Sequence, residues 1–234
     1  MNLRIEVVAI DCLMVRLFDA IDEANMPWML AASLRLREGF GAQLIDLVPS
    51  YTTLMVHYDL MALAPQQARA LIIEALNDLA PDAGKGGRRH VLPVWYDLSV
   101  GPELTLLSKR SGLPMDEVIR RHSQREYQVF ALGFAPGFAF MGLVEEILAA
   151  PRINTPRKRV AAGSVGIAER QTAAYPLESP GGWNILGRTP AKLFDREIDG
   201  YSLMQPGDTV RYEPIDHAEF IRLGGDDTPL EALA

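Results

Sequence analysis

Apolar positions in the first hundred residues form two helical stripes and several strand-like runs. Residues 4–18 are rich in Val, Ile and Leu, and apolar positions alternate from Leu13 to Leu17, which is typical of strands with one buried face. Runs at 43–48 and 52–58 predict a hairpin. Spacings of three and four residues predict two helices, with stripes formed by Met29, Ala32, Ser33, Leu36 and Phe40 and by Ala68, Leu71, Ile72, Ala75 and Leu79.

A further strand over residues 89–95 completes the predicted order βαββαβ, the ferredoxin-like pattern. A four-stranded sheet with both helices on one face would bury both apolar stripes. We therefore expect the fold class to be α+β, with a ferredoxin-like α+β domain over residues 1–97.

The composition changes in the second half of the chain. After a linker at 96–102, the pattern predicts short helices at 103–110 and 115–122. From residue 133 to 214, glycines and prolines recur every few residues, and short β-branched or aromatic runs lie between them, at 159–160, 164–168, 172–175, 183–186 and 209–212. Short strands with frequent turns are typical of a closed or nearly closed barrel. Residues 98–234 are therefore expected to form a β-barrel domain.

Composition excludes several classes of function. Of the 234 residues only Cys12 is a cysteine, which excludes a disulfide framework and a cysteine-based zinc site. The four histidines lack metal-ligand spacing, so we expect no metal. No apolar run approaches the ~18 residues of a membrane span, and a net charge of −7 argues against non-specific nucleic-acid binding. We expect a cytoplasmic protein that binds neither membrane nor nucleic acid.

Two segments are candidates for binding chemistry. Residues 133–142 place aromatic side chains between glycines and a proline, which fits either a loop plugging a barrel end or the wall of a pocket. Residues 151–159 concentrate four cations in a run that also holds two prolines. Such a run is commonly a solvated surface, but the prolines restrict the backbone and favour presentation of Arg157 and Arg159 to an anion.

Three further sets of residues have alternative interpretations. Ser164 stands in a Gly-Ser-x-Gly context, but no helical stripe follows it, which favours a hydrogen-bonding role over that of a nucleophile. His122 falls on the apolar face of its predicted helix, as a core histidine or as a proton donor and acceptor lining a pocket. Tyr175 and Trp183 bring polar-tipped aromatic bulk to an irregular loop, which indicates a binding surface but no particular reaction.

Seven short motifs lie in a fixed order along the second half of the chain. They are Gly-Phe-Ala-Pro-Gly-Phe at 133–138, Thr-Pro-Arg at 155–157, Ala-Gly-Ser-Val-Gly-Ile-Ala at 162–168, Gln-Thr at 171–172, Tyr-Pro at 175–176, Ser-Pro-Gly-Gly-Trp at 179–183 and Gly-Arg-Thr-Pro at 187–190. Their order and spacing resemble the family of bacterial 5-oxoprolinase B subunits, which includes proteins named allophanate hydrolase subunit 1 and KipI-type inhibitors of sporulation histidine kinases. This family is related to the carboxyltransferase subdomains C and D of urea carboxylase.

The resemblance covers nearly the whole chain and implies a ferredoxin-like domain followed by a cyclophilin-like β-barrel. It also implies an obligate subunit of a heteromeric enzyme that opens 5-oxo-L-proline to L-glutamate with hydrolysis of ATP to ADP and phosphate. The implied partners are a carboxyltransferase A/B-type protein, which is the C subunit of 5-oxoprolinase, and the lactam-binding A subunit. ATP would act in the assembled complex, and this chain alone would be inactive.

The resemblance also implies roles for individual residues. Arginines would stabilise the anionic phosphorylated species, hydroxyl and amide groups would position substrate or water, and aromatic rings would exclude water. The residues expected to act in catalysis are Arg157, Arg159, Ser164, Gln171, Tyr175 and, as a proton shuttle, His122. Those expected to bind substrate or cofactor are Phe134, Pro136, Gly137, Phe138, Ser179, Gly182, Trp183 and Arg188.

This chain departs from the family pattern at one turn, where Glu169-Arg170 replaces the usual Gly-Gly before Gln171. Larger charged side chains there would narrow a pocket or change a subunit contact, which leaves the exact amide or lactam open. Two alternatives also stay open: a KipI-like protein that binds and inhibits a sensor histidine kinase, and a structural subunit whose partner carries the catalytic residues. A missing pocket and an exposed apolar patch would favour the kinase inhibitor.

Overall fold

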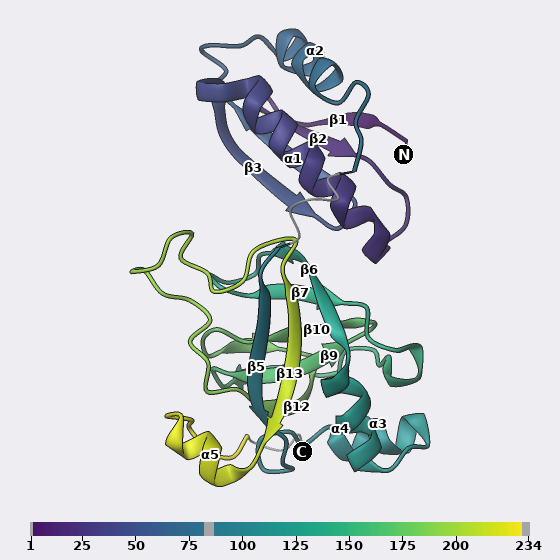
Figure 1. Ribbon diagram of the computed structural model, residues 1–234, viewed down its shortest axis with the longest axis vertical. Helices are drawn as coiled ribbons and strands as arrows, with labels where there is room; N and C mark the ends of the chain where they lie inside the picture. Colours follow the sequence, from purple (N-terminus) through teal and green to yellow (C-terminus); the bar gives the residue numbers. More distant parts are fainter. Residues whose placement is uncertain (1, 82–86, 231–234) are drawn as a thin grey trace. The chain divides into compact units, whose positions relative to one another are not determined.

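The computed structural model describes residues 2–81 and 87–230, which divide into two compact units, Met1–Gly86 and Gly87–Ala234 (Figure 1). The first unit is a four-stranded antiparallel sheet with two helices. Its strands are β1 (Arg4–Ala9), β2 (Cys12–Arg16), β3 (Leu44–Ser50) and β4 (Thr53–Tyr58), in the order β1-β2-β4-β3. Its helices are α1 (Met26–Phe40) and α2 (Pro65–Ala75), with the short turns η1 (Glu23–Asn25) and η2 (Gly41–Gln43).

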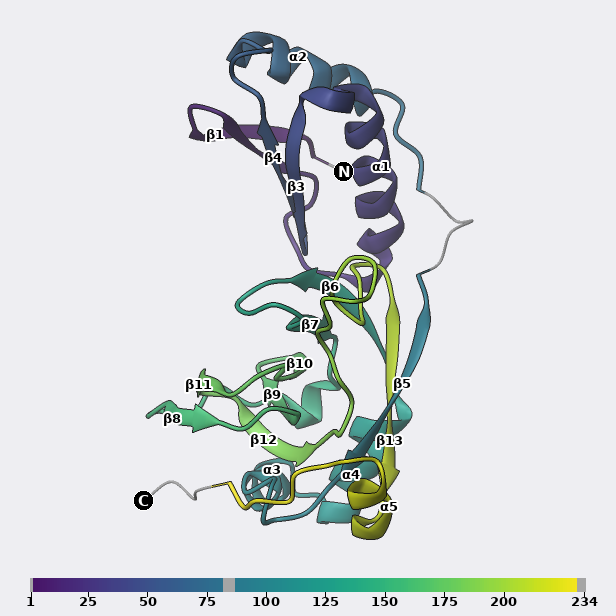
Figure 2. The same ribbon diagram turned by 90° about the vertical axis from the view of Figure 1, so that its left-hand side faces the viewer.

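The core of this unit follows the predicted stripes. Figure 2 shows α1 lying along one face of the sheet. Met29, Leu36 and Phe40 of α1 and Ile72 of α2 are buried, and Ser33, at the edge of its stripe, is half-buried. Alternate residues of β2 and β4 are buried as well, as expected of strands with one face against helices. The two predicted helices and the hairpin are confirmed.

The expected βαββαβ order is wrong at both ends. Residues 4–18 form the two strands β1 and β2, joined by a turn after Ala9, rather than one strand before the helix. Strand β5 (Arg89–Trp95) belongs to the second unit, where it pairs in parallel with β13 (Thr209–Ile215) and meets β12 (Asn184–Arg188) at one antiparallel pair. The observed order of the first unit is ββαββα, and the division between the units lies ahead of β5.

The second unit is a closed seven-stranded barrel, which confirms the predicted barrel. Its strand order is β10-β7-β6-β13-β5-β12-β9. The remaining barrel strands are β6 (Glu126–Leu132), β7 (Ala139–Gly142), β9 (Ser164–Ala168) and β10 (Gln171–Ala174). Strands β8 (Arg157–Val160) and β11 (Ser179–Gly181) form a separate two-stranded sheet. Buried apolar side chains fill the core, among them Leu92, Val94, Val129, Met141, Ile167 and Leu186.

Within the described residues, three helices belong to the barrel unit, two between β5 and β6 in the sequence and one after β13. They are α3 (Leu104–Ser111) and α4 (Met115–Gln124), which confirm the predicted pair, and α5 (His217–Arg222), with the short turn η3 (Glu146–Leu148). Within residues 2–81 and 87–230, no helix combines the length and apolar character needed to cross a lipid bilayer.

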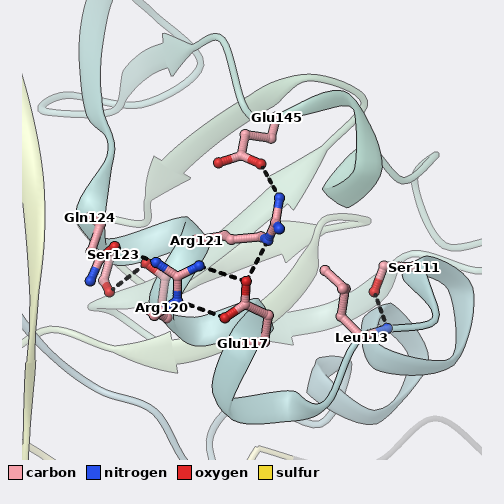
Figure 3. Close-up of polar contacts among 8 residues, drawn as sticks. All are labelled: Ser111, Leu113, Glu117, Arg120, Arg121, Ser123, Gln124 and Glu145. Carbon is pink, nitrogen blue, oxygen red and sulfur yellow. Dashed lines mark hydrogen bonds and ion pairs between the residues drawn. The ribbon is translucent and has the colours of Figure 1, made fainter.

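Helix α4 separates a charged surface from a buried face. Figure 3 shows Arg121 between two carboxylates, donating hydrogen bonds to Glu117 at 2.7 Å and to Glu145 at 2.8 Å. Arg120 donates two bonds of 2.6 Å to Glu117. These hydrogen bonds lower the pKa of Glu117 to about 2. The network fixes the outer face of α4, while Val118 and His122 on the same helix are buried.

Candidate functional site

A cavity of about 210 Å³ opens beside the barrel, and its wall is mainly aromatic. It lies between the loop at 133–138, strand β7 and the segment at 175–183. Its lining consists of Phe134, Phe138, Phe140, Arg152, Pro156, Tyr175, Pro180, Gly181, Gly182 and Trp183. The three motif segments that the sequence brings forward as binding loops therefore meet at one place.

Phe138 is the centre of the aromatic wall. Its ring lies edge-to-face with Phe134 and Tyr175, each at 5.2 Å between centroids, and with Trp183 at 5.7 Å. Edge-to-face pairs at these separations add to the apolar burial of the rings. Phe134 is 64% exposed whereas Phe138 is buried, so the wall runs from the surface into a second buried cluster, separate from the barrel core, that also contains Val160 and Ile185.

The loop that carries this wall requires glycine at one position. Gly137 has φ of +82°, and a Cβ there would lie 2.8 Å from the carbonyl oxygen of Leu193. Both the left-handed backbone and the close approach exclude a side chain. Phe134 itself adopts φ of +68°, an uncommon conformation for a non-glycine residue, and it lies in the cavity lining. Pro136 lies between these two residues, so the loop is held in one shape.

Tyr175 supplies a hydroxyl at the cavity wall. Burial raises the pKa of Tyr175 to about 12, while the positive charge of Arg152 and a hydrogen bond with the Trp183 backbone act in the opposite direction. The phenol therefore stays protonated at neutral pH and can donate a hydrogen bond. A Cβ at Gly181 would overlap this hydroxyl, so glycine is needed beside it.

Arg152 is the cation that sequence reasoning missed at this cavity. It belongs to the cationic run at 151–159, from which we singled out Arg157 and Arg159, yet Arg152 is the member that lines the aromatic cavity. Its exposure lets the guanidinium meet an incoming anion. Phe140 lies in the lining, as expected of the aromatic residues in the run at 133–142, whereas Pro156, Pro180 and Gly181 stand in the cationic run or a motif but were not expected as site residues. Apolar walls with one hydroxyl and one cation suit a small molecule that carries an anionic group.

Arg157 and Arg159 have different surroundings. Arg157 is buried on β8 and donates to Glu103, whose second carboxylate oxygen accepts from the backbone N–H of Ile185 at 2.9 Å. This pair ties β8 to the start of α3 and to β12. Arg159 is exposed and makes two bonds of 2.9 Å to Glu178. Arg157 lies behind the cavity rather than in its lining.

His122 lies in the barrel core and lines neither the aromatic cavity nor the one at Arg188. Its Nδ1 is 2.8 Å from the Tyr96 hydroxyl, and its Nε2 is 3.0 Å from Oγ1 of Thr172. Because Thr172 donates its own proton to the carbonyl of Gly166, we assign the Nε2–H tautomer, with Nδ1 accepting from Tyr96. Burial lowers the pKa of His122 to about 3, so the ring is neutral at physiological pH. These contacts fit the interpretation of His122 as a core histidine, and its role as a proton shuttle stays a prediction.

The remaining predicted residues lie on strands, and none of them is in the lining of the aromatic cavity. Gln171 is half-buried on β10, opposite Gly142 and Ala168. Ser164 is buried on β9, directly across from Arg188 on β12, and its Oγ has no hydrogen-bond partner among the described residues. Ser179 is half-buried on β11. Arg188 is buried and lines a second cavity.

One group of potential metal ligands lies in the described part of the first unit. The donor atoms of Asp11, Cys12 and His57 lie within 4.8 Å of one another. Asp11 Oδ2 and His57 Nε2 are 3.2 Å apart, which a hydrogen bond between the two side chains explains. The three residues lie on or beside β2 and β4, in a different compact unit from the aromatic cavity.

Known proteins match this chain along most of its length. Residues 3–204 match the family described as carboxyltransferase domain, subdomain C and D. The B subunit of 5-oxoprolinase from Bacillus subtilis (strain 168) is 34% identical over 93% of this chain and 95% of that protein. The protein of the same name from Escherichia coli O157:H7 is 46% identical over 53% of this chain and 56% of its own length.

A solved structure shares both fold and sequence. The crystal structure of TTHA0988 superposes with a TM-score of 0.76 at 34% identity, over 88% of this chain. This chain spans 40% of the length of that protein. With the match along residues 3–204 and the near full-length likeness to the Bacillus protein, the chain belongs to the carboxyltransferase subdomain C and D family and, within it, to the B subunits of 5-oxoprolinase.

Proposed function

We propose that this chain is the B subunit of an ATP-dependent 5-oxoprolinase, which opens 5-oxo-L-proline to L-glutamate with hydrolysis of ATP to ADP and phosphate. The observation that carries the proposal is the likeness to the Bacillus B subunit over 93% of this chain and 95% of that protein. The partners are a carboxyltransferase A/B-type protein, the C subunit, and the lactam-binding A subunit. The barrel is of the cyclophilin-like type.

The reaction requires activation of the substrate because a lactam carbonyl is a poor electrophile. The lactam oxygen attacks the γ-phosphorus of ATP, so an O–P bond forms and ADP leaves. Water then adds to the activated carbon, and the C–N bond breaks with protonation of nitrogen, which leaves γ-glutamyl phosphate. A second water hydrolyses this acyl phosphate to glutamate and phosphate. Both the phosphorylated lactam and the substrate carboxylate are anionic, so cations and hydrogen-bond donors must surround them.

The aromatic cavity offers these groups in one place. Its apolar walls at Phe138 and Trp183 would cover the faces of the five-membered ring and exclude bulk water from the phosphorylated species. The protonated Tyr175 hydroxyl would donate to a substrate oxygen, and Arg152 at the cavity would attract a carboxylate or phosphoryl group. A missing pocket would have favoured the kinase inhibitor. The presence of this cavity supports a role in the enzyme instead.

Reconstitution tests the proposal. Glutamate release from 5-oxoproline is measured with ATP for this chain alone, for the two partner subunits without it, and for all three together. We expect activity only in the complete mixture, with one ADP formed per glutamate. A complete mixture that assembles stably, by size-exclusion chromatography, yet forms no glutamate would overturn the proposed substrate. Activity of the two partners at the full rate without this chain would overturn its role as an obligate subunit.

A further inference from the structure

A buried arginine lies under the C-terminal segment of the second unit. Arg188 on β12 is 1% exposed and lines a cavity of about 240 Å³, distinct in its lining from the aromatic cavity. On one side are Arg159, Ala161 and Glu178, and on the other is the segment 226–230, here called the C-terminal strap. One terminal nitrogen of Arg188 donates to the backbone oxygens of Asp226 at 2.6 Å and Thr228 at 2.9 Å.

The strap offsets only part of the free-energy cost of burying the Arg188 charge. Burial lowers the pKa of Arg188, against the attraction of Asp226 and Asp227. The nearest carboxylate oxygen, on Asp226, is 4.0 Å away on a side chain that is 71% exposed, and the Nε of Arg188 has no hydrogen-bond partner among the described residues. Arg157, by contrast, has a buried carboxylate in direct contact. Charge-assisted bonds to an anion are stronger than bonds to neutral carbonyls, so Arg188 lies in a site where an oxyanion would bind better than the strap.

The strap is held by a limited set of contacts. Besides those with Arg188, an oxygen of the Asp227 carboxylate lies 2.9 Å from Nε2 of His217, and Leu230 packs against the buried cluster around Phe138. The Asp226 carboxylate accepts from the backbone N–H of Thr228 at 3.0 Å and from its hydroxyl at 2.6 Å, which forms the turn that points both carbonyls at Arg188. The backbone N–H of Leu230 donates to the carbonyl of Ser99 at 2.8 Å. Residues 226–229 are exposed. A segment with little burial and few hydrogen bonds opens at low free-energy cost.

We propose that Arg188 is the centre of a binding site for an oxyanion, a carboxylate or phosphate group, and that the strap occupies this site as an intramolecular stand-in which the ligand displaces. Its two carbonyl oxygens take the place of two ligand oxygens. In the proposed reaction the carboxylate of 5-oxoproline and the phosphates of ATP supply such a group, and to that extent the identity of the ligand rests on the proposed function. The site itself is tested with inorganic phosphate.

Hydrogen exchange and calorimetry on the full chain test this site. The backbone amide of Leu230 reports on the strap, because its hydrogen bond to Ser99 is lost when the strap opens. We expect saturating inorganic phosphate, 5-oxoproline, or both to speed exchange of this amide, and the pair of titrations identifies which oxyanion is the ligand. Binding of phosphate without faster exchange, or no binding of either compound, would overturn the proposal.

Two variants that each remove one negative charge distinguish displacement of the strap from a general effect of charge on anion binding. Asp226→Ala removes the turn that holds the strap, and Asp199→Ala removes the same charge from an exposed position elsewhere. Because one or two hydrogen bonds are lost, Asp226→Ala should tighten binding of the displacing anion by roughly three- to tenfold and speed Leu230 exchange without ligand. Asp199→Ala should resemble the unaltered chain, and equal behaviour of the two variants would contradict the proposal. If the anion binds as expected but reconstitution yields no glutamate, only the substrate assignment fails.

Discussion

Arg157→Ala should lower the free energy of unfolding of the second unit by about 3–5 kcal/mol, because it leaves a buried carboxylate without its cation. The side chains of Arg157 and Glu103 are 4% and 8% exposed and in direct contact. Without the arginine, Glu103 still accepts a hydrogen bond from the backbone N–H of Ile185, but it has lost its cation. The loss should be measured by chemical unfolding of the variant and of the unaltered chain.

A double-mutant cycle distinguishes this pair from a simple packing effect. Glu103→Leu leaves the buried guanidinium without its carboxylate and should also destabilise strongly. The double variant Arg157→Ala with Glu103→Leu removes both charges, so its loss should be smaller than the sum of the two single losses. Additive losses would show that the two charges do not act as a pair.

His122 should make the second unit unstable in acid. Its pKa is about 3 in the folded protein against 6.5 for an ordinary histidine. Below about pH 6.5 the unfolded chain therefore binds a proton that the folded chain does not. The free energy of unfolding should therefore fall by several kcal/mol as pH drops from about 6.5 toward 3. Above about pH 6.5 His122 causes no such loss.

His122→Gln removes this titration and should flatten the acid slope of unfolding between pH 6 and 4. The matched control is His57→Gln, which alters a half-buried histidine of the first unit and should leave the slope of the second unit in place. Histidine NMR gives a direct reading, since the His122 ring should stay neutral down to about pH 4. A His122 ring that titrates near pH 6.5 would contradict the buried network.

Periodicity predicts the helices of this chain well. It predicts poorly which sheet each strand joins. The stripes on α1 and α2 lie on the buried faces because a helix with one apolar side has only one way to bury it. Strand β5 alternates in the same way, with Leu92 and Val94 buried, but alternation fits any sheet with one covered face. Its neighbour β13 lies more than 100 residues away in sequence. Only that long-range pairing assigns β5 to the barrel.

For the candidate site too, the sequence predicts some features and leaves others open. Glycines and prolines around Phe134, Phe138 and Trp183 mark loops of fixed shape, and those loops form the cavity. The sequence does not show which arginine lines the cavity, because nothing within a run of cations indicates which side chain is buried. Arg157 is enclosed by Glu103, a residue more than 50 positions earlier, whereas Arg152 lies at the cavity. Burial and partners of charged residues follow from tertiary structure.

The central claim is that the aromatic cavity serves the reaction of the assembled enzyme, and two adjacent glycines test it most directly. A Cβ at Gly181 would overlap the Tyr175 hydroxyl, whereas a Cβ at Gly182 would meet its nearest neighbour, Pro156, at an ordinary 3.6 Å. The measurement is ATP-dependent glutamate formation by complexes carrying Gly181→Ala or Gly182→Ala in this chain. Displacement of the hydroxyl should lower the rate by at least about tenfold for Gly181→Ala, and the loss for Gly182→Ala should be much smaller. A folded and fully assembled Gly181→Ala complex that works at the unaltered rate would contradict the account.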